Sequence, residues 1–490
     1  MDTLRCYFVT WNVATKSPGQ DLNSLLDFPS QYNKNKPLPD FYVLGLQEVK
    51  SQPQNMLMDS LFTDPWTSSF NKILCRQGFI IAKSTRLQGL VLLVYTHLKH
   101  VMHLRDIEAQ YTKTGLGGMW GNKGAVSVRF NIYGCSVCFV NSHLTAHDHL
   151  LADRINDYNA IIKQHEYHAG ETTNILYHDY VFWLGDLNFR TDHPPDDSPT
   201  AEEIVEALNT VEKDKYSNLL KHDQLLAVME TGEAFSEFVE PEIRFPPTYK
   251  FSIGGDEYDV KRKPSWTDRI LYKVIANNYE NVTLRVDLLS YNHMPHYTVS
   301  DHKPVVALYS IKAFSNYTEK IVEFAPISRI WYIGDADFRT QCTLSPDVEV
   351  HPNDWIGIYD ANFYNLDDYI AYEYLAKVSL PHAPSAPGQP RTITLRFPVG
   401  SGVRTPGFYR FIYFSQPNSD VRSVLGISEP FEVSSKEDSL VTVDPCDQAS
   451  TSSSPGRSKP SNANSDIFTD FTGLDVAKLS RHFSNDLTFD

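Results

Sequence analysis

The stretch that decides the fold is Trp183-Leu184-Gly185-Asp186-Leu187-Asn188-Phe189-Arg190. The apolar run leading into it, from Val181 to Leu184, is short and stops at a glycine, which predicts a buried strand rather than a helix. Directly after this strand, Asp186 and Asn188 present a carboxylate and an amide at one spot. A lone pattern of this kind is usually a strand followed by a turn rich in Asp and Asn. Its meaning therefore depends on what the rest of the chain offers.

Other apolar runs in the same half of the chain also meet polar residues at their ends. They are residues 4–11 before Asn12, residues 41–46 before Gln47 and Glu48, residues 136–141 before His143, and residues 304–310 after Asp301 and His302. Each polar residue alone predicts only a cap, a turn or a solvated loop. Polar groups at the ends of several central strands converge when two sheets pack face to face. We therefore expect these side chains to meet on one rim of a sheet sandwich.

The remaining periodicity of this half supports that architecture. Further strands are predicted at residues 90–95, 125–130 and 269–273, and amphipathic helices at residues 150–167, 202–208 and 222–229. Strands interspersed with helices in this way predict an α/β sandwich of two packed sheets with helices outside.

Basic residues gather in loops of this otherwise acidic chain. Four cations lie between Lys261 and Arg269, beside a tryptophan and Asp268, and Tyr249 and Lys250 follow a proline-stiffened turn. Arg and Lys are the usual partners of phosphate groups, although a basic run is often only a solvated loop. The glycine-rich segment 115–124 lets backbone approach a phosphate but matches neither the P-loop nor the dinucleotide pattern.

Composition limits the possible function classes. A chain of 490 residues predicts two or three domains, and a net charge of -16 argues against a nucleic-acid binder. The six cysteines are scattered, which predicts a reducing compartment without a disulfide framework. Met1 to Arg5 lead straight into a predicted strand, and the longest apolar runs are much shorter than a membrane span. We therefore expect a soluble, cytoplasmic protein.

The second half of the chain has a different character. Residues 319–433 contain short β-rich segments separated by Pro, Gly and Asn/Asp turns, which predicts a small all-β sandwich. Strands are predicted at residues 327–333, 355–359, 370–378, 392–397 and 408–414. From residue 434 the chain is rich in Ser, Pro and Asn, so residues 434–490 are predicted to be a largely disordered tail.

Seven of these segments together resemble the motifs of the inositol polyphosphate 5-phosphatases. In chain order they are Phe8–Asn12, Leu44–Glu48, Gly121–Ala125, Asn141–Leu144, Trp183–Arg190, Pro264–Leu271 and Ser300–Val305. The resemblance covers residues 1–312 and implies a catalytic domain at 1–314 with the four-layered α/β sandwich of DNase I and the apurinic endonucleases. Residues 319–433 resemble a SKICH domain, an immunoglobulin-like β-sandwich, as in the skeletal-muscle and kidney-enriched type of this family.

The family implies Mg²⁺-dependent hydrolysis of the 5-phosphate from phosphatidylinositol 4,5-bisphosphate and 3,4,5-trisphosphate, and from soluble inositol polyphosphates. By resemblance, Asp186 orients and deprotonates the attacking water with help from Asn188, and Asp268 holds His302 against the scissile phosphate. The other implied assignments are His143 as a catalytic phosphate contact; Asn122, Tyr249, Lys250, Lys261 and Arg262 as substrate-binding residues; and Glu48, Asn12 and Asp301 as Mg²⁺ ligands. Arg190 either contacts substrate or braces its loop, and it receives no catalytic role.

Two rival functions and several partners complete the expectations. A Mg²⁺-dependent nuclease shares the same core residues, but the basic loops and acidic charge argue against it. A scaffold without turnover would be expected to lack Asp186, Asn188 or His302, and all three are present. We expect peripheral recruitment to the plasma membrane or endoplasmic reticulum, a protein partner for the SKICH domain and no nucleic acid. Leu116, Met119 and Trp120 are predicted either to dip into lipid or to pack internally.

Overall fold

A computed structural model describes residues 3–28, 37–50, 64–118, 120–170, 172–314, 317–335, 338–381, 388–398 and 402–436. Almost all of the predicted tail (434–490), together with Met119, lies outside these residues, and so do the side-chain surroundings of Leu116. Every described residue belongs to one unit, Met1–Ser439. No helix among them is both long and apolar enough to cross a membrane.

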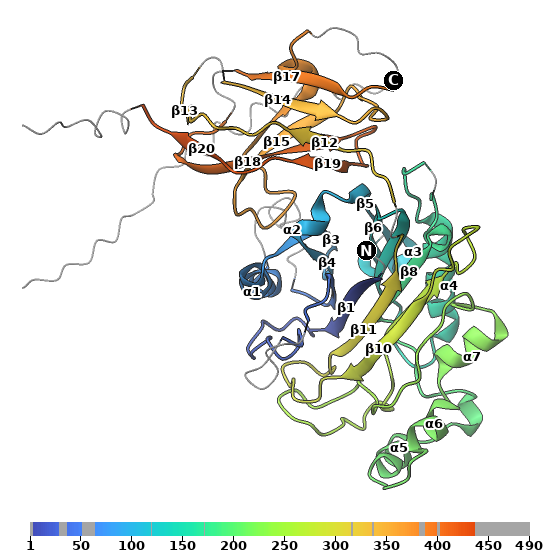
Figure 1. Cartoon of the computed structure of the whole chain (residues 1–490). Coiled ribbons are helices and arrows are strands. Elements are labelled where there is room, and N and C mark those ends of the chain that lie inside the picture. Colours follow the sequence, from blue (N-terminus) through green and yellow to red (C-terminus); the bar gives the residue numbers. More distant parts are fainter. Residues whose placement is uncertain are drawn as a thin grey trace, which may run out of the picture. The chain divides into compact units, whose positions relative to one another are not determined.

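Two β-sheets organise the first part of the chain (Figure 1). The first sheet contains, in order, β10 (Val286–His293), β11 (Val305–Lys312), β1 (Thr3–Asn12), β2 (Phe41–Gln47), β4 (Leu90–His97) and β3 (Phe79–Leu87). The second contains β5 (Leu104–Thr114), β6 (Trp120–Ile132), β7 (Cys135–His143), β8 (Tyr180–Asp186) and β9 (Asp268–Val274). One central pair in each sheet is parallel, β1 with β2 and β7 with β8, and the other pairs are antiparallel.

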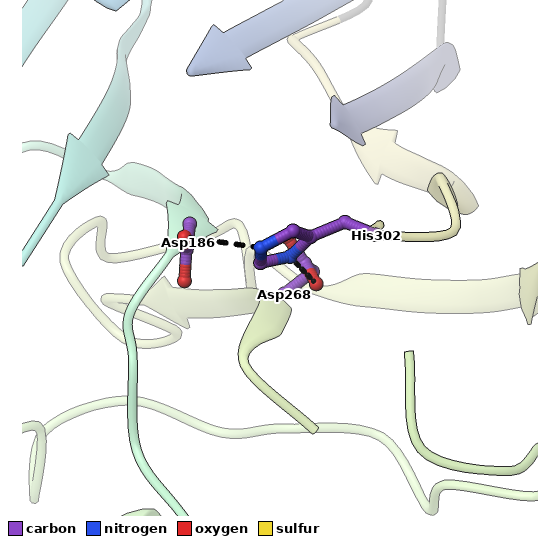
Figure 2. A group of neighbouring side chains, drawn as sticks. All are labelled: Asp186, Asp268 and His302. Carbon is purple, nitrogen blue, oxygen red and sulfur yellow. Dashed lines mark hydrogen bonds and ion pairs between the residues drawn. The ribbon is translucent and has the colours of Figure 1, made fainter. Parts of the chain in front are cut away.

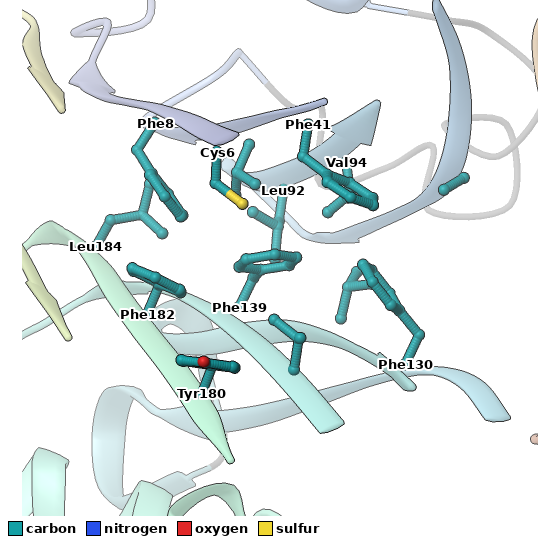
Figure 3. Packing of buried hydrophobic residues seen from close by; sticks show 14 of the residues in the cluster. Cys6, Phe8, Phe41, Leu92, Val94, Phe130, Phe139, Tyr180, Phe182 and Leu184 are labelled. Atoms are coloured by element: carbon teal, nitrogen blue, oxygen red, sulfur yellow. The ribbon is translucent and has the colours of Figure 1, made fainter. Parts of the chain in front are cut away.

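The core between the two sheets is built from alternate residues of the central strands (Figure 3). Phe8 of β1 stacks on Phe182 of β8 with ring centroids 4.6 Å apart, and Phe139 of β7 packs against both rings. The residues between them point the opposite way, so that Trp11 and Trp183 lie in the outer clusters. Strands buried on both faces show a continuous apolar run instead of alternation. This explains the strong strand signal of residues 181–184.

Helices cover the outer faces of both sheets and complete four layers. On the first sheet, α1 (Pro65–Leu74) buries Trp66, Phe70 and Leu74. It begins where Asp64 accepts the N–H groups of Trp66 and Thr67, with a proline at the first helical position. On the second sheet, α4 (Leu151–Gln164) and α7 (Gln224–Thr231) pack against the outer cluster. The shorter helices are α2 (Leu98–Val101), α3 (Gly115–Gly118), α5 (Ala201–Leu208) and α6 (Lys215–Leu220).

The carboxyl-terminal part is the predicted all-β sandwich. Its smaller sheet contains β12 (Val322–Phe324), β14 (Phe338–Leu344) and β17 (Arg391–Phe397). Its larger sheet contains β13 (Trp331–Tyr332), β20 (Phe431–Ser434), β18 (Gly407–Ser415), β15 (Trp355–Asp360) and β16 (Ala371–Tyr374), with β19 (Ser423–Ile427) beside β18. The predicted strand at 370–378 is wrong in its second half, where α8 (Leu375–Val378) forms a helical turn. Leu375 and Val378 are both buried, and a three-residue spacing puts both side chains on one face of such a turn.

The β-sandwich covers one edge strand of each catalytic sheet with its own backbone. At β3, the Ile81 N–H donates to the Tyr364 carbonyl at 2.7 Å, and the Leu366 N–H donates to Ile81 at 3.0 Å. At β5, Ile107 and Arg422 exchange N–H donations of 2.7 and 3.2 Å. A β-bulge in each edge strand lies at the point of contact. The bulge bends the strand locally and leaves backbone groups available for a partner.

Side chains make the same junction apolar. Along β15, Ile356 and Ile358 enter the core of the β-sandwich, whereas Trp355 and Tyr359 enter the cluster that fills the catalytic sandwich. Leu366 joins that catalytic cluster and is fully buried. Because one continuous cluster contains residues of both parts, the two parts stabilise each other.

Candidate active site

The strand-end residues meet on one rim of the sandwich, as the sequence predicts. In the second sheet, Asp186 lies opposite His143 in the parallel pair and opposite Asp268 in the antiparallel pair. In the first sheet, Asn12 ends β1 beside Gln47, and Ser300 donates to the Asn12 carbonyl at 2.6 Å. Parallel strands end at the same edge of a sheet, which is why residues distant in sequence converge here.

Asp186 lies at the centre of this rim and is almost fully buried. Its Oδ2 accepts the side-chain amide of Asn12 at 2.9 Å and lies 3.2 Å from His143 Nε2 and 3.9 Å from His302 Nε2. Burial favours the neutral acid, but the charged ring of His302 and the hydrogen bond from His143 outweigh it and hold the pKa of Asp186 well below its usual value. Asp186 is therefore an ionised carboxylate at neutral pH.

His302 and Asp268 form a buried pair beside Asp186 (Figure 2). The ring Nδ1 lies 2.9 Å from Asp268 Oδ2, which also accepts the hydroxyls of Thr248 at 2.7 Å and Thr267 at 2.9 Å. Burial works against the charged ring, but the carboxylates of Asp268 and Asp186 prevail and raise the pKa of His302 to about 9. The three residues lie close enough to hold a metal ion. A protonated ring has no lone pair for a metal, so this group is better suited to placing an imidazolium at the rim.

Asn188 is held next to Asp186 by a tight local arrangement. Its backbone lies in the left-handed region with φ of 58°, and its N–H donates to Asp186 Oδ1 at 3.2 Å. Its amide donates to the Leu144 carbonyl and accepts from Arg190 at 2.6 Å. The Arg190 guanidinium also lies 4.8 Å from the centre of the Tyr249 ring. Arg190, which received no catalytic role from the sequence, thus braces Asn188 and Tyr249 together.

Lys123 is a site residue that the sequence analysis missed. Its Nζ lies 2.5 Å from His143 Nε2. Burial lowers the pKa of Lys123 to about 8, although the carboxylates of Asp186 and Glu48 oppose this change. Its neighbour Asn122 is exposed and lines, with Lys123 and His147, a cavity of about 620 Å³. The sequence signal that could have identified Lys123 was its position directly after Asn122 in the family motif.

The predicted substrate-binding residues come from two loops beside His302. The Tyr249 ring lies 4.4 Å from the His302 ring, and Lys250 Nζ lies 3.4 Å from Asp301. The structure thus places Asp301 beside Lys250. Arg262 lies 3.6 Å from Asp148, which also pairs with Arg190 at 3.7 Å. Lys261 is exposed, and its N–H donates to Asp259.

Asn12 and Glu48, two of the predicted metal ligands, lie together. The Asn12 amide donates to Glu48 Oε1 at 3.1 Å, and the Glu48 side chain is 42 % exposed. Glu48 has φ of 55°, and the Thr15 N–H donates to its carbonyl at 2.9 Å. A non-glycine residue held in the left-handed region is typical of functional sites. The Glu48 carboxylate fits a hard cation such as Mg²⁺ or Ca²⁺. The Asn12 amide oxygen accepts the Ala14 N–H at 3.0 Å, so Asn12 can add a ligand oxygen when its amide turns.

Comparison with known proteins agrees with this geometry. Residues 9–308 match the endonuclease/exonuclease/phosphatase family 2, and residues 322–433 match the SKICH domain. Mouse inositol polyphosphate 5-phosphatase K is 30% identical over 443 residues, which are 88% of this chain and 90% of that protein. Human phosphatidylinositol 4,5-bisphosphate 5-phosphatase A is 33% identical over 97% of this chain, but the chain spans only 48% of that relative's length.

Solved structures give the same fold. The inositol polyphosphate 5-phosphatase domain of SPsynaptojanin, in complex with inositol (1,4)-bisphosphate and a calcium ion, has a TM-score of 0.52 and 32% identity, covering 64% of this chain and 85% of its own. The Cimex nitrophorin ferrous NO complex has a TM-score of 0.50 at 23% identity, covering 63% of this chain and 99% of its own. The second likeness shows the fold alone, because one fold can carry unrelated functions.

Proposed function

Because the chain belongs to the inositol polyphosphate 5-phosphatase family, we propose that it removes the 5-phosphate from phosphatidylinositol 4,5-bisphosphate and 3,4,5-trisphosphate and from soluble inositol polyphosphates. The observation that carries this proposal is the ionised Asp186 held between Asn12, His143 and the charged His302. An anion that orients water and a cation that meets phosphate then lie about one water molecule apart.

In the proposed reaction, water attacks phosphorus and the bond from phosphorus to the inositol 5-oxygen breaks. One proton of the water ends on the departing oxygen, so the products are an inositol hydroxyl and phosphate. Asp186 accepts a hydrogen bond from this water and aims its lone pair. The depressed pKa of Asp186 makes it a weak proton acceptor. Phosphoryl transfer passes through a loose transition state, in which the water loses its proton late, so orientation matters more than basicity. Asp186 therefore acts chiefly by positioning the nucleophile.

The proposed role of His302 is electrostatic. Its Nε2 faces Asp186 across 3.9 Å, so a phosphoryl oxygen bound there meets a charged N–H donor. Asp268 fixes the proton on Nδ1 and keeps the ring charged. Lys123 extends the cationic side of the rim, whereas burial and the Lys123 charge lower the pKa of His143 and keep that ring neutral. Preorganised donors of this kind stabilise the charge that develops on a transferring phosphoryl group.

A magnesium ion fits the carboxylate of Glu48, and Asn12 is the proposed neutral ligand once its amide oxygen turns from Ala14 toward the ion. When bound, it supplies positive charge that stabilises the phosphoryl oxygens and the departing inositol oxygen. Asp301 is the third proposed ligand, and it lies 3.4 Å from Lys250, a proposed substrate-binding residue.

Tyr249 and Lys250 are proposed to bind the 4-phosphate, which neighbours the scissile group on the inositol ring. Tyr249 lies directly against His302, which supports this order. Arg262 and the exposed Lys261 are proposed to contact the remaining phosphates. The lipid substrates require peripheral association with a membrane, for which Trp120, 49% exposed, is a candidate contact. We propose a cytoplasmic protein with a protein partner for the SKICH domain, recruited to the plasma membrane or endoplasmic reticulum.

Phosphate release from a panel of phosphoinositides and soluble inositol polyphosphates tests the proposal. We expect Mg²⁺-dependent release from substrates with a 5-phosphate, no cleavage of abasic DNA, and a loss of at least about a thousandfold in Asp186→Ala. Near-normal turnover in that variant, or release from the DNA, would show the assignment to be wrong.

A further inference from the structure

One surface of the β-sandwich has an unusual combination of exposed aromatic rings and acidic residues. Tyr369, Tyr372 and Tyr374 are 41%, 44% and 46% exposed, and we call these three residues the tyrosine face. Residues 340–376 contain seven Asp and Glu residues and not one Lys or Arg. An exposed aromatic cluster on an acidic surface is characteristic of an interaction site rather than of ordinary solvated sandwich.

The tyrosine face continues the apolar junction between the two parts of the chain. Tyr374 pairs with Trp355 across the β15–β16 ladder, and Tyr372 pairs with Gly357, so both side chains share a face with Trp355. The catalytic sandwich covers this side of the sheet at Trp355 and Tyr359. The tyrosine face, on the same side, is left uncovered. The surface is therefore an open extension of an established interface.

A cavity of about 530 Å³ opens at this place. Trp355, Tyr369, Tyr372 and Tyr374 line it. The ring centroids of Trp355, Tyr369 and Tyr372 lie 5.4 to 5.8 Å from one another with interplanar angles of 65° to 80°. Three rings at nearly right angles present their faces and edges to a common corner. Aromatic faces attract a cation that comes within about 6 Å of the ring centre.

The cavity lining carries two cations and two carboxylates, and its half-exposed carboxylate, Asp420, lies beside the aromatic rings. Lys83 and Arg422 also line it, but Asp367 lies 3.3 Å from the ammonium and 2.6 Å from the guanidinium. These two cations are thus engaged within the protein. Asp420 lines the cavity as well, and its side chain is 52% exposed. A carboxylate beside aromatic faces matches arginine in particular, since a guanidinium stacks on rings and pairs with carboxylates.

We propose that this cavity binds an arginine-bearing, basic segment of a partner protein. Exposed Asp368, next to Tyr369 in the chain, disfavours an anionic bilayer, so we take the tyrosine face as a protein-binding surface and not the membrane-facing one. The inference rests on the proposed protein partner of the SKICH domain and does not depend on the phosphatase activity. Because Lys83 comes from β3, a bound segment contacts both parts of the chain.

The test measures binding of a dye-labelled peptide of alternating serine and arginine to the full chain by fluorescence anisotropy. Tyr372→Ala and Tyr369→Ala leave the net charge unchanged and remove one wall of the cavity each. We expect each to weaken binding by about five- to thirtyfold at physiological salt. Tyr177→Ala, which removes a more exposed tyrosine of the catalytic part (64% exposed), should bind like the unchanged protein.

Charge and partner class are tested in the same way. Asp420→Asn should weaken peptide binding more than Asp196→Asn, an exposed acidic residue elsewhere. Phosphate release from a soluble inositol polyphosphate should be equal in all five variants, which reports on folding. Equal peptide binding by Tyr372→Ala and Tyr177→Ala would overturn the proposal, because general attraction to an acidic protein would then explain it. The proposal would also be overturned if Tyr372→Ala lost binding to phosphatidylcholine–phosphatidylserine vesicles, because the face would then contact membrane. It would likewise be overturned if the unchanged chain self-associated and Tyr372→Ala did not.

Discussion

Asp268→Asn isolates the electrostatic contribution of one buried carboxylate to the proposed reaction. Asp268 Oδ2 accepts hydrogen bonds from Thr248 and Thr267 and holds His302 Nδ1 at 2.9 Å, whereas Oδ1 has no partner among the described residues. An asparagine oxygen can replace Oδ2, and its amide can occupy the place of Oδ1. The shape of the site is then kept while the negative charge is lost.

The magnitude follows from the pKa of His302. With a pKa of about 9, the ring is about 90% protonated at pH 8. Removing a neighbouring opposite charge lowers a pKa by about one to three units, and burial of the ring lowers it too. A decrease of about two units leaves about a tenth of the rings charged at pH 8 and most of them charged at pH 6. Asp268→Asn should therefore lose about tenfold in kcat/KM at pH 8 and much less near pH 6.

The assay is phosphate release from a soluble inositol polyphosphate, measured as kcat/KM from about pH 6 to about pH 9 in the presence of Mg²⁺. The unchanged protein should lose activity in two steps, as Lys123 loses its charge through about pH 8 and His302 through about pH 9, and only the second step should move toward neutral pH in Asp268→Asn. Thr248→Val, which removes a hydrogen bond to the same oxygen but no charge, is the matched control. The alkaline decrease of its kcat/KM should occur at nearly the same pH as in the unchanged protein. An equal loss at every pH in Asp268→Asn, with the second step unmoved, would refute the reasoning.

Stability should follow the same titration. The pKa of His302 in the folded protein lies above its unfolded value of about 6.5, so its pairing stabilises the fold fully below about pH 6.5. That contribution is lost as pH rises through about 9. Thermal unfolding of the unchanged protein should show this decrease, and Asp268→Asn should lack most of it.

Three further predictions concern the substrate, the membrane and the junction of the two parts. Lys250→Ala should lower kcat/KM for substrates with a 4-phosphate by about tenfold and affect those without one much less; equal losses would separate Lys250 from the 4-phosphate. Trp120→Ser should reduce activity on phosphoinositide vesicles while sparing a soluble inositol polyphosphate, and equal losses on both would assign this residue to packing. Leu366→Ala should destabilise the whole described unit by about 2–5 kcal/mol in a single urea transition, because this side chain is fully buried in the shared cluster. Two separate transitions, with the catalytic one unchanged, would contradict a shared core.

The strands that the sequence predicted best are those buried on both faces. Residues 181–184 alternate between the inner core and the outer cluster, and both environments are apolar, so the signal is continuous. The sequence analysis missed β10 and β5 for the opposite reason. Leu288 and Leu289 of β10 are exposed, and each strand contains a β-bulge that breaks the alternation of period two.

The candidate site was predictable where its residues follow strands and harder to predict where function depends on contacts in space. Asp186, His143 and Asn12 stand at strand ends that the topology brings to one rim. The part played by Arg190 depends on its lying over Tyr249, which is distant in the sequence. The interaction of Lys123 with His143 is likewise a contact across a strand pair. Sequence periodicity indicates which residues are buried, but it does not indicate which long side chains will meet.

The backbone pairing of the β-sandwich with Ile81 and Ile107 of the catalytic part affects how this protein folds during synthesis. The catalytic half leaves the ribosome first, and its edge strands β3 and β5 then lack their partners at Tyr364, Leu366 and Arg422. Synthesis proceeds at roughly 5–20 residues per second, so the stretch up to β20 takes on the order of ten seconds. During that interval two bulged edges and an apolar face are open to other nascent chains. We expect a catalytic fragment that ends near Lys312 to depend on chaperones far more than the full chain does.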